Sequence, residues 1–319
     1  MAGFDALQFG IFDQNDHGPS SLAEQYEARL RLIELYDRSG FRTYHMSEHH
    51  ATPLNLTPSP SVFLAAVAQR TKRLRFGALV YVLPTHHPLR LAEEVCMLDH
   101  LSQGRVEVGV GRGASPHELA YFGVDPDGAP AMYVEAYTVL MQALTQAEVN
   151  FSGRHYRFAN VPIDLQPFQR PHPPLWYAVP VPDGAAWSAQ HGINVVCGGP
   201  LSRVREITDR YRAEWAAAGR PADELPLLGL NRFVLAADTD REAMALGRRA
   251  WPKFYASFMK LWKLHGTQPR NIRLPEDFDT LVENGGAIAG SPGTISDRIR
   301  RMTEDGGVNY FISQFSFGD

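Results

Sequence analysis

The sequence predicts a (β/α)₈ barrel, and two observations favour this fold. Short apolar runs alternate with longer amphipathic segments along the 319 residues, and about eight strand–helix units fit into that length. No Gly-x-Gly-x-x-Gly follows the first apolar run, which argues against the runner-up, an open doubly wound sheet that binds a dinucleotide. We therefore expect a single domain over residues 1–319, with its functional site at the carboxyl ends of the strands.

Periodicity places four units in the first half of the chain. In the first helix, Leu30, Ile33 and Leu35 recur at helical spacing, and Gly40 ends the segment. The third apolar run is long and rich in β-branched and aromatic residues, which is typical of a strand. We expect strands at 7–12, 43–47, 74–83 and 105–110, and helices at 22–38, 61–70, 89–101 and 130–146.

The second half interrupts this rhythm twice. Residues 149–170 read as a β-hairpin insertion, and the polar stretch 263–286, which shows no periodicity, reads as a mobile loop at the active site. We expect strands at 175–179, 194–197, 227–236 and 310–315, and helices at 183–191, 202–218, 241–261 (kinked at Pro252) and 291–304. The sequence stops after the last strand, so an eighth outer helix is missing or truncated. The barrel should then be open to solvent on one side or covered by a partner.

Composition narrows the class of partner and compartment. The chain has 31 basic and 35 acidic residues, a net charge of −4, which disfavours nucleic acid or an anionic membrane as the main partner. Two cysteines, Cys96 and Cys197, imply no disulfide framework and fit a reducing cytoplasm. The N-terminus lacks the pattern of a signal peptide, and no apolar run is long enough to span a membrane.

The sharpest cluster of reactive side chains follows the second predicted strand. Glu48, His49 and His50 are consecutive there. A histidine is the usual general base near neutral pH, and a nearby carboxylate can fix its tautomer, so this cluster is our candidate catalytic site. A histidine pair bonded to the loop backbone is the simpler alternative. A metal site that also uses His86 and His87 is disfavoured, because no His-Glu-x-x-His spacing is present.

Two further features have structural and functional interpretations. The turn 108–113, Val-Gly-Val-Gly-Arg-Gly, lets the backbone approach a ligand and offers Arg112 to a phosphate or carboxylate, although a tight strand-to-helix turn explains it as well. A set of aromatic residues also recurs at helical spacing, and core or interface packing is favoured over a pocket wall. These residues are Trp251, Phe254, Tyr255, Phe258 and Trp262.

Several segments together resemble bacterial luciferase and the luciferase-like flavin-dependent monooxygenases. The most specific segments lie in the first 113 residues, and their order and spacing match as well. They are Gly40-Phe41, Ser47-Glu48-His49-His50, Leu74-Arg75-Phe76-Gly77, Val82-Leu83-Pro84-Thr85-His86-His87-Pro88, Leu98-Asp99-His100-Leu101-Ser102-Gln103-Gly104-Arg105 and Gly109-Val110-Gly111-Arg112-Gly113. Residues 186–192 and 290–294 continue the likeness downstream.

This resemblance implies a (β/α)₈ barrel that binds reduced FMN, or coenzyme F420 in some branches. Monooxygenase members receive reduced FMN from a separate flavin reductase and use O₂ to oxidise an aldehyde, ketone or hydrocarbon. By position, Glu48 would lie beside the flavin and His49 would be the catalytic base. A non-prolyl cis peptide is expected at Leu79–Val80, under the flavin ring, and the stretch 263–286 corresponds to a mobile active-site loop.

The resemblance also assigns a phosphate pocket, and here the chain departs from the family. Gly111, Arg112 and Gly113 match the segment that meets the flavin phosphate. After the fifth strand, however, Val179 and Pro180 begin a Val-Pro-Val-Pro run with no hydroxyl group and two fewer backbone donors. A second arginine expected near 129–131 is absent, and Ser115 replaces a tyrosine. We therefore expect weak, transient FMN binding.

Three hypotheses follow from these observations. The first is a two-component FMN-dependent monooxygenase that acts on a small apolar carbonyl or hydrocarbon substrate, because charged clamps other than Arg112 are lacking. The second is an F420-dependent oxidoreductase on the same barrel. The third is a non-catalytic flavin-binding protein. Family members pair through the helices at 61–70 and 89–101, so a homodimer is also expected.

Overall fold

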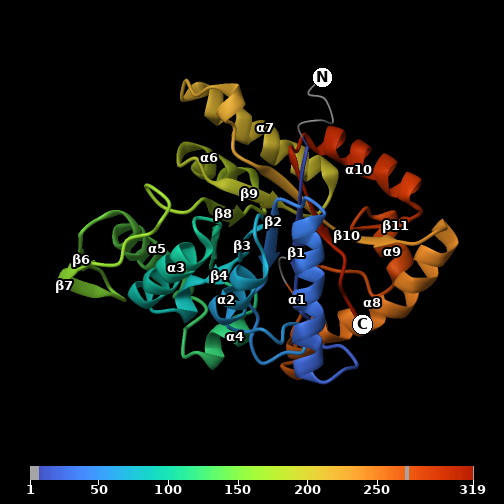
Figure 1. Cartoon of the computed structure of the whole chain (residues 1–319), viewed down its shortest axis with the longest axis horizontal. Coiled ribbons are helices and arrows are strands. Elements are labelled where there is room, and N and C mark those ends of the chain that lie inside the picture. The colour runs from blue at the N-terminus through green and yellow to red at the C-terminus, as the bar shows by residue number, and fades with distance from the viewer. Residues whose placement is uncertain (1–6, 270–272, 319) are drawn as a thin grey trace.

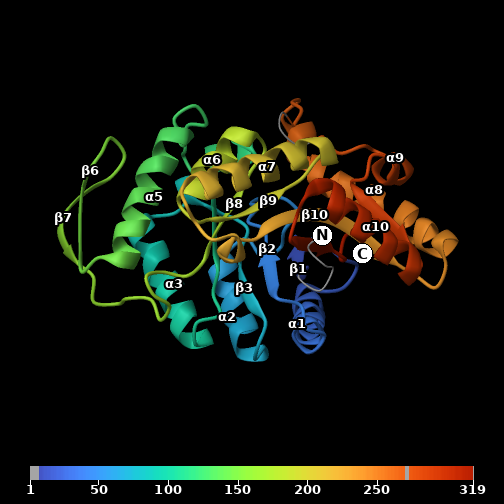
Figure 2. The same cartoon turned by 90° about the horizontal axis from the view of Figure 1, so that it is seen from above.

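The alternating segments fold into a parallel barrel wrapped by helices (Figure 1). This computed structural model describes residues 7–269 and 273–318. The strand order is β3-β2-β1-β12-β10-β9-β8-β5-β4, and β11 pairs with β10. Because β3 and β4 are two halves of one interrupted strand, the ring is closed. Figure 2 shows the strands in the middle, with α1, α2 and α3 on one side and α6 and α7 on the other.

The element bounds are close to those predicted. The barrel strands are β1 Gln8–Asp13, β2 Thr43–Met46, β3 Arg75–Ala78, β4 Tyr81–Val82, β5 Val108–Gly111, β8 Leu175–Ala178, β9 Asn194–Cys197, β10 Leu228–Ala236, β11 Ala287–Gly290 and β12 Tyr310–Gln314. The helices are α1 Leu22–Arg38, α2 Pro60–Arg70, α3 Pro88–Ser102, α4 Pro116–Tyr121, α5 Ala129–Thr145, α6 Pro182–Gln190, α7 Leu201–Ala217, α8 Asp240–Leu264, α9 Phe278–Glu283 and α10 Pro292–Gly306. Short 3₁₀ turns cover Leu83–Thr85 and Ala222–Glu224.

The third predicted strand is interrupted, and the predicted hairpin forms outside the barrel. The predicted strand 74–83 is divided into β3 and β4 at the Leu79–Val80 peptide bond, which is cis, as the family resemblance implied. Within 149–170, β6 (Glu148–Ser152) and β7 (Arg157–Pro162) pair antiparallel and form a separate two-stranded sheet. α8 contains Pro252 in its interior.

The stretch 263–286 was predicted to lack regular structure, and this prediction was wrong in part. α8 continues to Leu264, and α9 forms inside the stretch, where Phe278 and Leu281 are buried in an apolar cluster. Residues 270–272 lie outside the described part of the chain. The sequence reading also missed β11, which pairs with the second half of β10 from Phe233 to Ala236.

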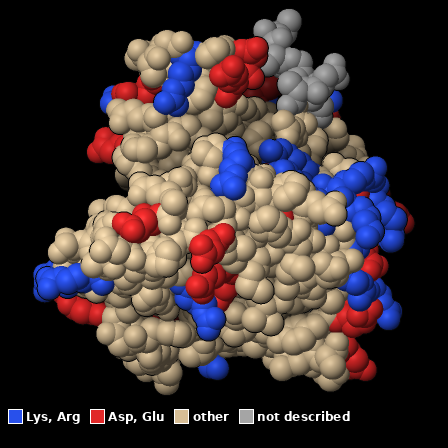
Figure 3. Space-filling model, turned by 60° about the vertical axis from the view of Figure 1, so that its left-hand side comes forward, with Lys and Arg blue, Asp and Glu red and all other residues tan. Residues whose placement is uncertain are grey.

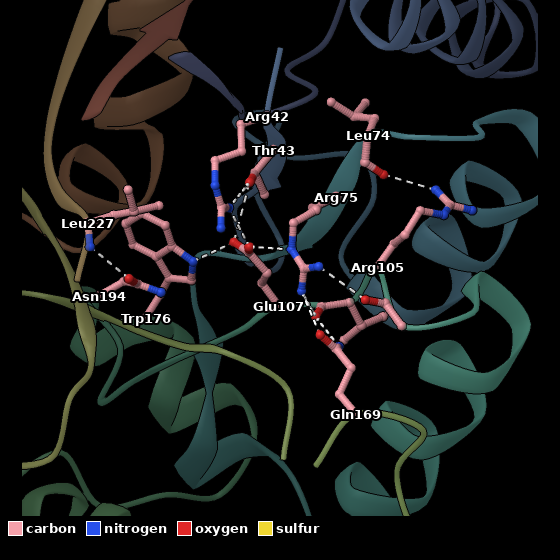
Figure 4. Close-up of polar contacts among 12 residues, drawn as sticks. Arg42, Thr43, Leu74, Arg75, Arg105, Glu107, Gln169, Trp176, Asn194 and Leu227 are labelled. Carbon is pink, nitrogen blue, oxygen red and sulfur yellow. Dashed lines mark hydrogen bonds and ion pairs between the residues drawn. The ribbon is translucent and has the colours of Figure 1, made fainter. Parts of the chain in front are cut away.

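A buried ion cluster fills the N-terminal end of the barrel (Figure 4). The Glu107 carboxylate is fully buried and accepts hydrogen bonds at 2.6 Å from Arg42, Arg75 and the indole N–H of Trp176. Burial raises the pKa of Glu107, but the charges of the two arginines outweigh it and lower that pKa. The cluster pairs charges whose burial would otherwise cost free energy. This end of the barrel is therefore filled, and its role is to stabilise the fold.

The middle of the barrel is filled by large side chains that face inward. Tyr310 and Trp176 are fully buried there, and His45 Nε2 lies 3.1 Å from the Tyr310 hydroxyl. Burial lowers the pKa of His45 to about 4, so its ring is neutral. A Cβ at Gly10 would overlap the Tyr310 hydroxyl, which explains why this strand position requires glycine.

The outer face beside β1 and β12 carries an open groove. Its volume is about 450 Å³, and it is lined by apolar residues such as Phe9, Phe41, Ile299 and Phe315, with α10 on one side. Residues 315–318 follow β12 and form no helix within the described chain. Between the end of α1 and α10, this groove leaves part of the outer face of the strands uncovered by a helix within the described chain.

The helices and the surface give two further findings. Among the described residues, no helix is both long and apolar enough to cross a membrane. On the face shown in Figure 3, acidic and basic side chains are interspersed, and broad areas carry neither.

Candidate functional site

The C-terminal end of the barrel is accessible to solvent. Inward-facing Phe12, Val80, Asn231 and Phe233 are partly exposed there, and Ala178 is exposed, whereas inward-facing residues at the other end are buried. An accessible mouth at the carboxyl ends of the strands is where a (β/α)₈ barrel places its ligand site. The candidate residues were predicted at these strand ends.

Glu48 is the hub of the loop after β2. Its buried carboxylate accepts hydrogen bonds from His50 Nε2 at 2.9 Å, from His86 Nε2 at 2.8 Å, and from the Val82 backbone N–H at 3.1 Å. Thr85 donates a further bond at 3.1 Å. Burial raises the pKa of Glu48, but the hydrogen bonds from both histidines outweigh it and lower that pKa to about 2. Glu48 is therefore ionised, and it holds the β2 and β4 loops together.

His49 has a different carboxylate partner from the one next to it in sequence. Its Nδ1 lies 3.1 Å from Glu118 Oε1, and the other oxygen of Glu118 accepts the backbone N–H of His50 at 2.9 Å. A histidine that donates through Nδ1 leaves Nε2 free as a proton acceptor. This pair has the arrangement expected of a general base and the group that orients it.

Sequence reasoning missed Glu118, although a signal for it exists. Ser115 caps α4 and accepts the backbone N–H of Glu118 at 3.4 Å. Ser-Pro-His-Glu over 115–118 is a helix start of the Ser-x-x-Glu type, which places Glu118 in the first turn. Here the carboxylate reaches the β2 loop instead of its own helix. The Ser-x-x-Glu pattern predicts the helix start, but it does not show that this helix lies against the loop after β2.

The histidine cluster and the glycine-rich turn line one small crevice. Glu48, His49, His50, Glu118 and the segment 113–115 surround a space of about 10 Å³, enough for roughly one water molecule. The structure therefore brings together the predicted catalytic residues and Gly113. The two other histidines near this loop diverge, since His86 binds Glu48 while His87 packs edge-on against Phe158 of the hairpin. Within the described ranges, no three His, Cys, Asp or Glu side chains are grouped as a metal site.

The remaining predicted cofactor residues lie around the mouth. A Cβ at Gly109 would overlap Ala78 O, and one at Gly111 would overlap Val80 Cγ2, so both glycines let β5 pack against the cis peptide. Arg112 is exposed, and no ion pair joins it to a carboxylate in the described chain. Across the mouth, Val179 is buried and packs into the outer apolar layer, while Pro180 is exposed.

Helix α8 reaches the loops around the crevice. Thr52 donates to the backbone oxygen of Ser257 at 3.1 Å, and Tyr121 OH lies 2.7 Å from His265 Nε2, just past the helix end. Two aromatic residues of α8 belong to the hydrophobic core. Trp251 and Phe254 are buried, and both contact inward-facing Phe233 with ring centroids about 5 Å apart. The favoured interpretation as packing holds for these two residues, and Phe233 connects them to the mouth.

Comparison with known proteins agrees with this geometry. The family model described as luciferase-like monooxygenase matches residues 7–310. The chain is 43% identical over 313 residues to the uncharacterized protein y4wF of Sinorhizobium fredii, covering 98% of this chain and 91% of that protein. It is 28% identical to limonene 1,2-monooxygenase of Rhodococcus erythropolis, covering 97% and 80% of the two chains.

A solved structure supports the fold. The oxygenating constituent of 3,6-diketocamphane monooxygenase from Pseudomonas putida, in complex with FMN, superposes with a TM-score of 0.80 at 20% identity, covering 98% of this chain and 92% of that one. At that identity the likeness establishes the barrel. The match of the family model over residues 7–310 shows that the chain belongs to the luciferase-like monooxygenase family.

Proposed function

We propose that the chain is the oxygenase of a two-component flavin-dependent monooxygenase. It would take reduced FMN, bound transiently, from a separate flavin reductase and use O₂ to oxidise a small apolar carbonyl or hydrocarbon substrate in the cytoplasm. The observation that carries the proposal is the His49–Glu118 pair, at 3.1 Å, at the accessible end of a luciferase-like barrel.

The residues at the mouth fit a flavin. The inward face offers an apolar floor from Val80 and Ala178 beside the cis peptide, where a flat ring can pack. Arg112 is exposed and unpaired with acid in the described chain, so its guanidinium is free to bind a phosphate. Arg112 is the one cation predicted for the phosphate pocket, and Val179 and Pro180 supply no hydroxyl group there. Because few groups bind the phosphate, we expect FMN to bind weakly and transiently.

The protein side chains have defined roles in this proposal. Reduced flavin, when bound, supplies the electrons that activate oxygen. Glu118 holds His49 in the tautomer that leaves Nε2 unprotonated, so that Nε2 accepts a proton from the reacting group. Glu48 and His50 keep this loop in place, with Glu48 as a fixed anion and not as an acid or base.

The proposed substrate is apolar because the mouth is lined by apolar and aromatic groups. Phe12 and Phe233 are partly exposed there, and α8 supplies aromatic residues behind Phe233. Inward-facing Gln314 is buried, and its Nε2 has no hydrogen-bond partner among the described residues. An amide N–H left free at this position suits a carbonyl oxygen of the substrate. The relative that oxidises limonene supports a substrate of this class.

Two experiments test the proposal. Titration with oxidised FMN, anaerobic reduced FMN and F420, followed by quenching of the five tryptophans, should show the tightest binding for reduced FMN. Binding of F420 alone would favour the F420-dependent oxidoreductase, and flavin binding without turnover would favour the non-catalytic protein. Turnover is measured with a supplied reductase, O₂ and a panel of terpenoid ketones and alkenes.

A pair of histidine variants separates catalysis from structure. His49→Ala should abolish oxygenation and leave flavin binding unchanged. His87→Ala is the matched control, because His87 follows a barrel strand but packs on the hairpin, away from the crevice. Equal loss of flavin binding and oxygenation in His49→Ala would contradict the role of His49 as a base.

We also propose a homodimer that pairs through α2 and α3. Apolar side chains on these helices face solvent, with Val62 74%, Met97 55% and Leu101 51% exposed. Exposed apolar side chains on two helices that pack together are typical of a protein interface. Sedimentation should show a dimer that Val62→Glu converts to monomer, and a monomer at all concentrations of the unmodified protein would refute the pairing.

A further inference from the structure

Arg232 is a buried cation without an acidic partner. It lies on β10 with its side chain 3% exposed, and it donates hydrogen bonds to two backbone carbonyls, Asn231 O at 2.8 Å and Gly199 O at 2.7 Å. Its Nε is buried and has no partner among the described residues. Nor does any carboxylate in the described part of the chain form an ion pair with it.

Such a charge is unfavourable unless something neutralises it. Burial lowers the pKa of Arg232 to about 10, opposed only by the nearby Cys197 thiol, so the side chain is still protonated at neutral pH. By contrast, buried Arg29 lies 3.4 Å from the Asp13 carboxylate. Buried charges in proteins are paired or bind an ion or ligand, and carbonyl groups neutralise a guanidinium only in part.

The backbone next to Arg232 is suited to an anion. Gly199, whose carbonyl oxygen accepts a bond from the guanidinium, precedes the N-cap Pro200 of α7, a helix of 17 residues. The N-cap Pro200 makes no side-chain capping bond, and the first turn contains no acidic residue. The free N–H groups of that turn and the helix dipole therefore point toward the loop that Arg232 contacts. A Cβ at Gly198 or Gly199 would meet no atom within 4 Å, so there is space above the loop.

We propose that Arg232 and the N-terminus of α7 form a binding site for a phosphate group. Arg232 would neutralise the phosphate from within the barrel wall, and the N–H groups of the first turn of α7 would bind its outer oxygens. This site is distinct from Arg112, which follows β5. FMN carries one phosphate, so this site takes the flavin phosphate only in place of Arg112, and otherwise it takes free inorganic phosphate.

The first experiment uses inorganic phosphate alone, without flavin, so that it does not depend on the proposed monooxygenase activity. Calorimetric titration at constant ionic strength, with chloride as reference, should show saturable phosphate binding to the unmodified protein. Arg232→Met should weaken this binding about tenfold or more, because it removes a charge-assisted contact. Arg232→Lys should retain part of it.

A second variant leaves Arg232 in place. Ser202→Asp adds a carboxylate to the exposed first turn of α7, where it should occupy the free N–H groups and also weaken phosphate binding about tenfold. Ser296→Asp is the control, because it adds the same charge to an exposed position of α10 and should have no effect. This pair keeps the test valid if Arg232→Met does not fold.

Comparison of FMN with riboflavin identifies the source of the phosphate. Loss of the affinity advantage of FMN over riboflavin in Arg232→Met would assign the site to the flavin phosphate. An unchanged advantage, with inorganic phosphate binding lost, would assign it to free phosphate. Absence of phosphate binding by the unmodified protein, or phosphate binding by Arg232→Met and by Ser202→Asp as tight as that of the unmodified protein, would overturn the proposal.

Discussion

Glu118→Gln tests whether His49 is oriented as a base. Glu118 contributes both of its oxygens, one to His49 Nδ1 at 3.1 Å and one to the His50 backbone N–H at 2.9 Å. Because the backbone N–H can only donate, the amide oxygen of a glutamine must stay on it. The amide NH₂ group then faces His49 Nδ1 and donates to it. This reverses the tautomer and leaves the proton on Nε2, where a base must be free.

The size of the effect follows from the bond that is lost. A hydrogen bond to a charged group contributes about 1.5–3 kcal/mol. The side chains of His49 and Glu118 are 21% and 12% exposed, so solvent weakens the bond, and we take about 2 kcal/mol. That value corresponds to a decrease in kcat/KM of about 30-fold. Affinity for reduced FMN should not change, because neither atom of the pair is assigned to flavin binding.

The assay is steady-state oxygenation with excess reductase, together with a direct titration of reduced FMN. Nitrogen NMR of His49 reports the tautomer, which a purely structural role of Glu118 would not reverse. Glu135→Gln is a matched control, because Glu135 also accepts backbone N–H groups, but from the hairpin. If Glu118→Gln retains full kcat/KM, or loses activity and flavin binding in the same proportion, the assignment of His49 and Glu118 is refuted.

Three further changes test the packing and electrostatics of the barrel. Glu107→Gln breaks the fully buried ion cluster and should lower the free energy of unfolding in urea by about 3–5 kcal/mol, and a loss below about 1 kcal/mol would contradict its role in stability. Burial raises the pKa of Asp16 to about 6, so the folded protein binds a proton at this carboxyl more tightly than the unfolded chain does. The protonated carboxyl therefore contributes to the free energy of unfolding in full below about pH 4, and this contribution is lost as the pH rises through 6. Asp16→Asn should therefore gain about 2–3 kcal/mol over the unmodified protein between pH 4 and pH 7, and equal curves in pH-dependent denaturation would exclude this. Gly111→Ala forces a methyl group into Val80 and should cost about 1–3 kcal/mol of stability, measured as a lower midpoint of thermal unfolding, and an unchanged midpoint would show that the two strands can separate.

The barrel could be predicted from the sequence, but the side-chain contacts across its mouth could not. Strand and helix periods are local, so the eight barrel positions could be predicted from windows of a few residues. α9 was missed because its six residues lie within the polar stretch 263–286, which shows no periodicity, and β11 was missed because its short run follows directly after that stretch. His49 was predicted from its place at a strand end, but Glu118 lies 69 residues away, and only the closed ring brings the two together.

The two ends of the barrel differ in whether their buried polar groups have hydrogen-bond partners, and this difference indicates which end binds a ligand. At the N-terminal end, the Glu107 carboxylate accepts hydrogen bonds from two arginines and an indole N–H, so it needs no donor from a ligand. At the C-terminal end, Arg232 Nε and Gln314 Nε2 are buried without partners among the described residues. Folding alone selects against unpaired buried donors, since each one costs free energy. Their presence on neighbouring strands at the accessible end is explained if bound ligands supply the missing acceptors, an oxyanion for Arg232 and a carbonyl oxygen for Gln314.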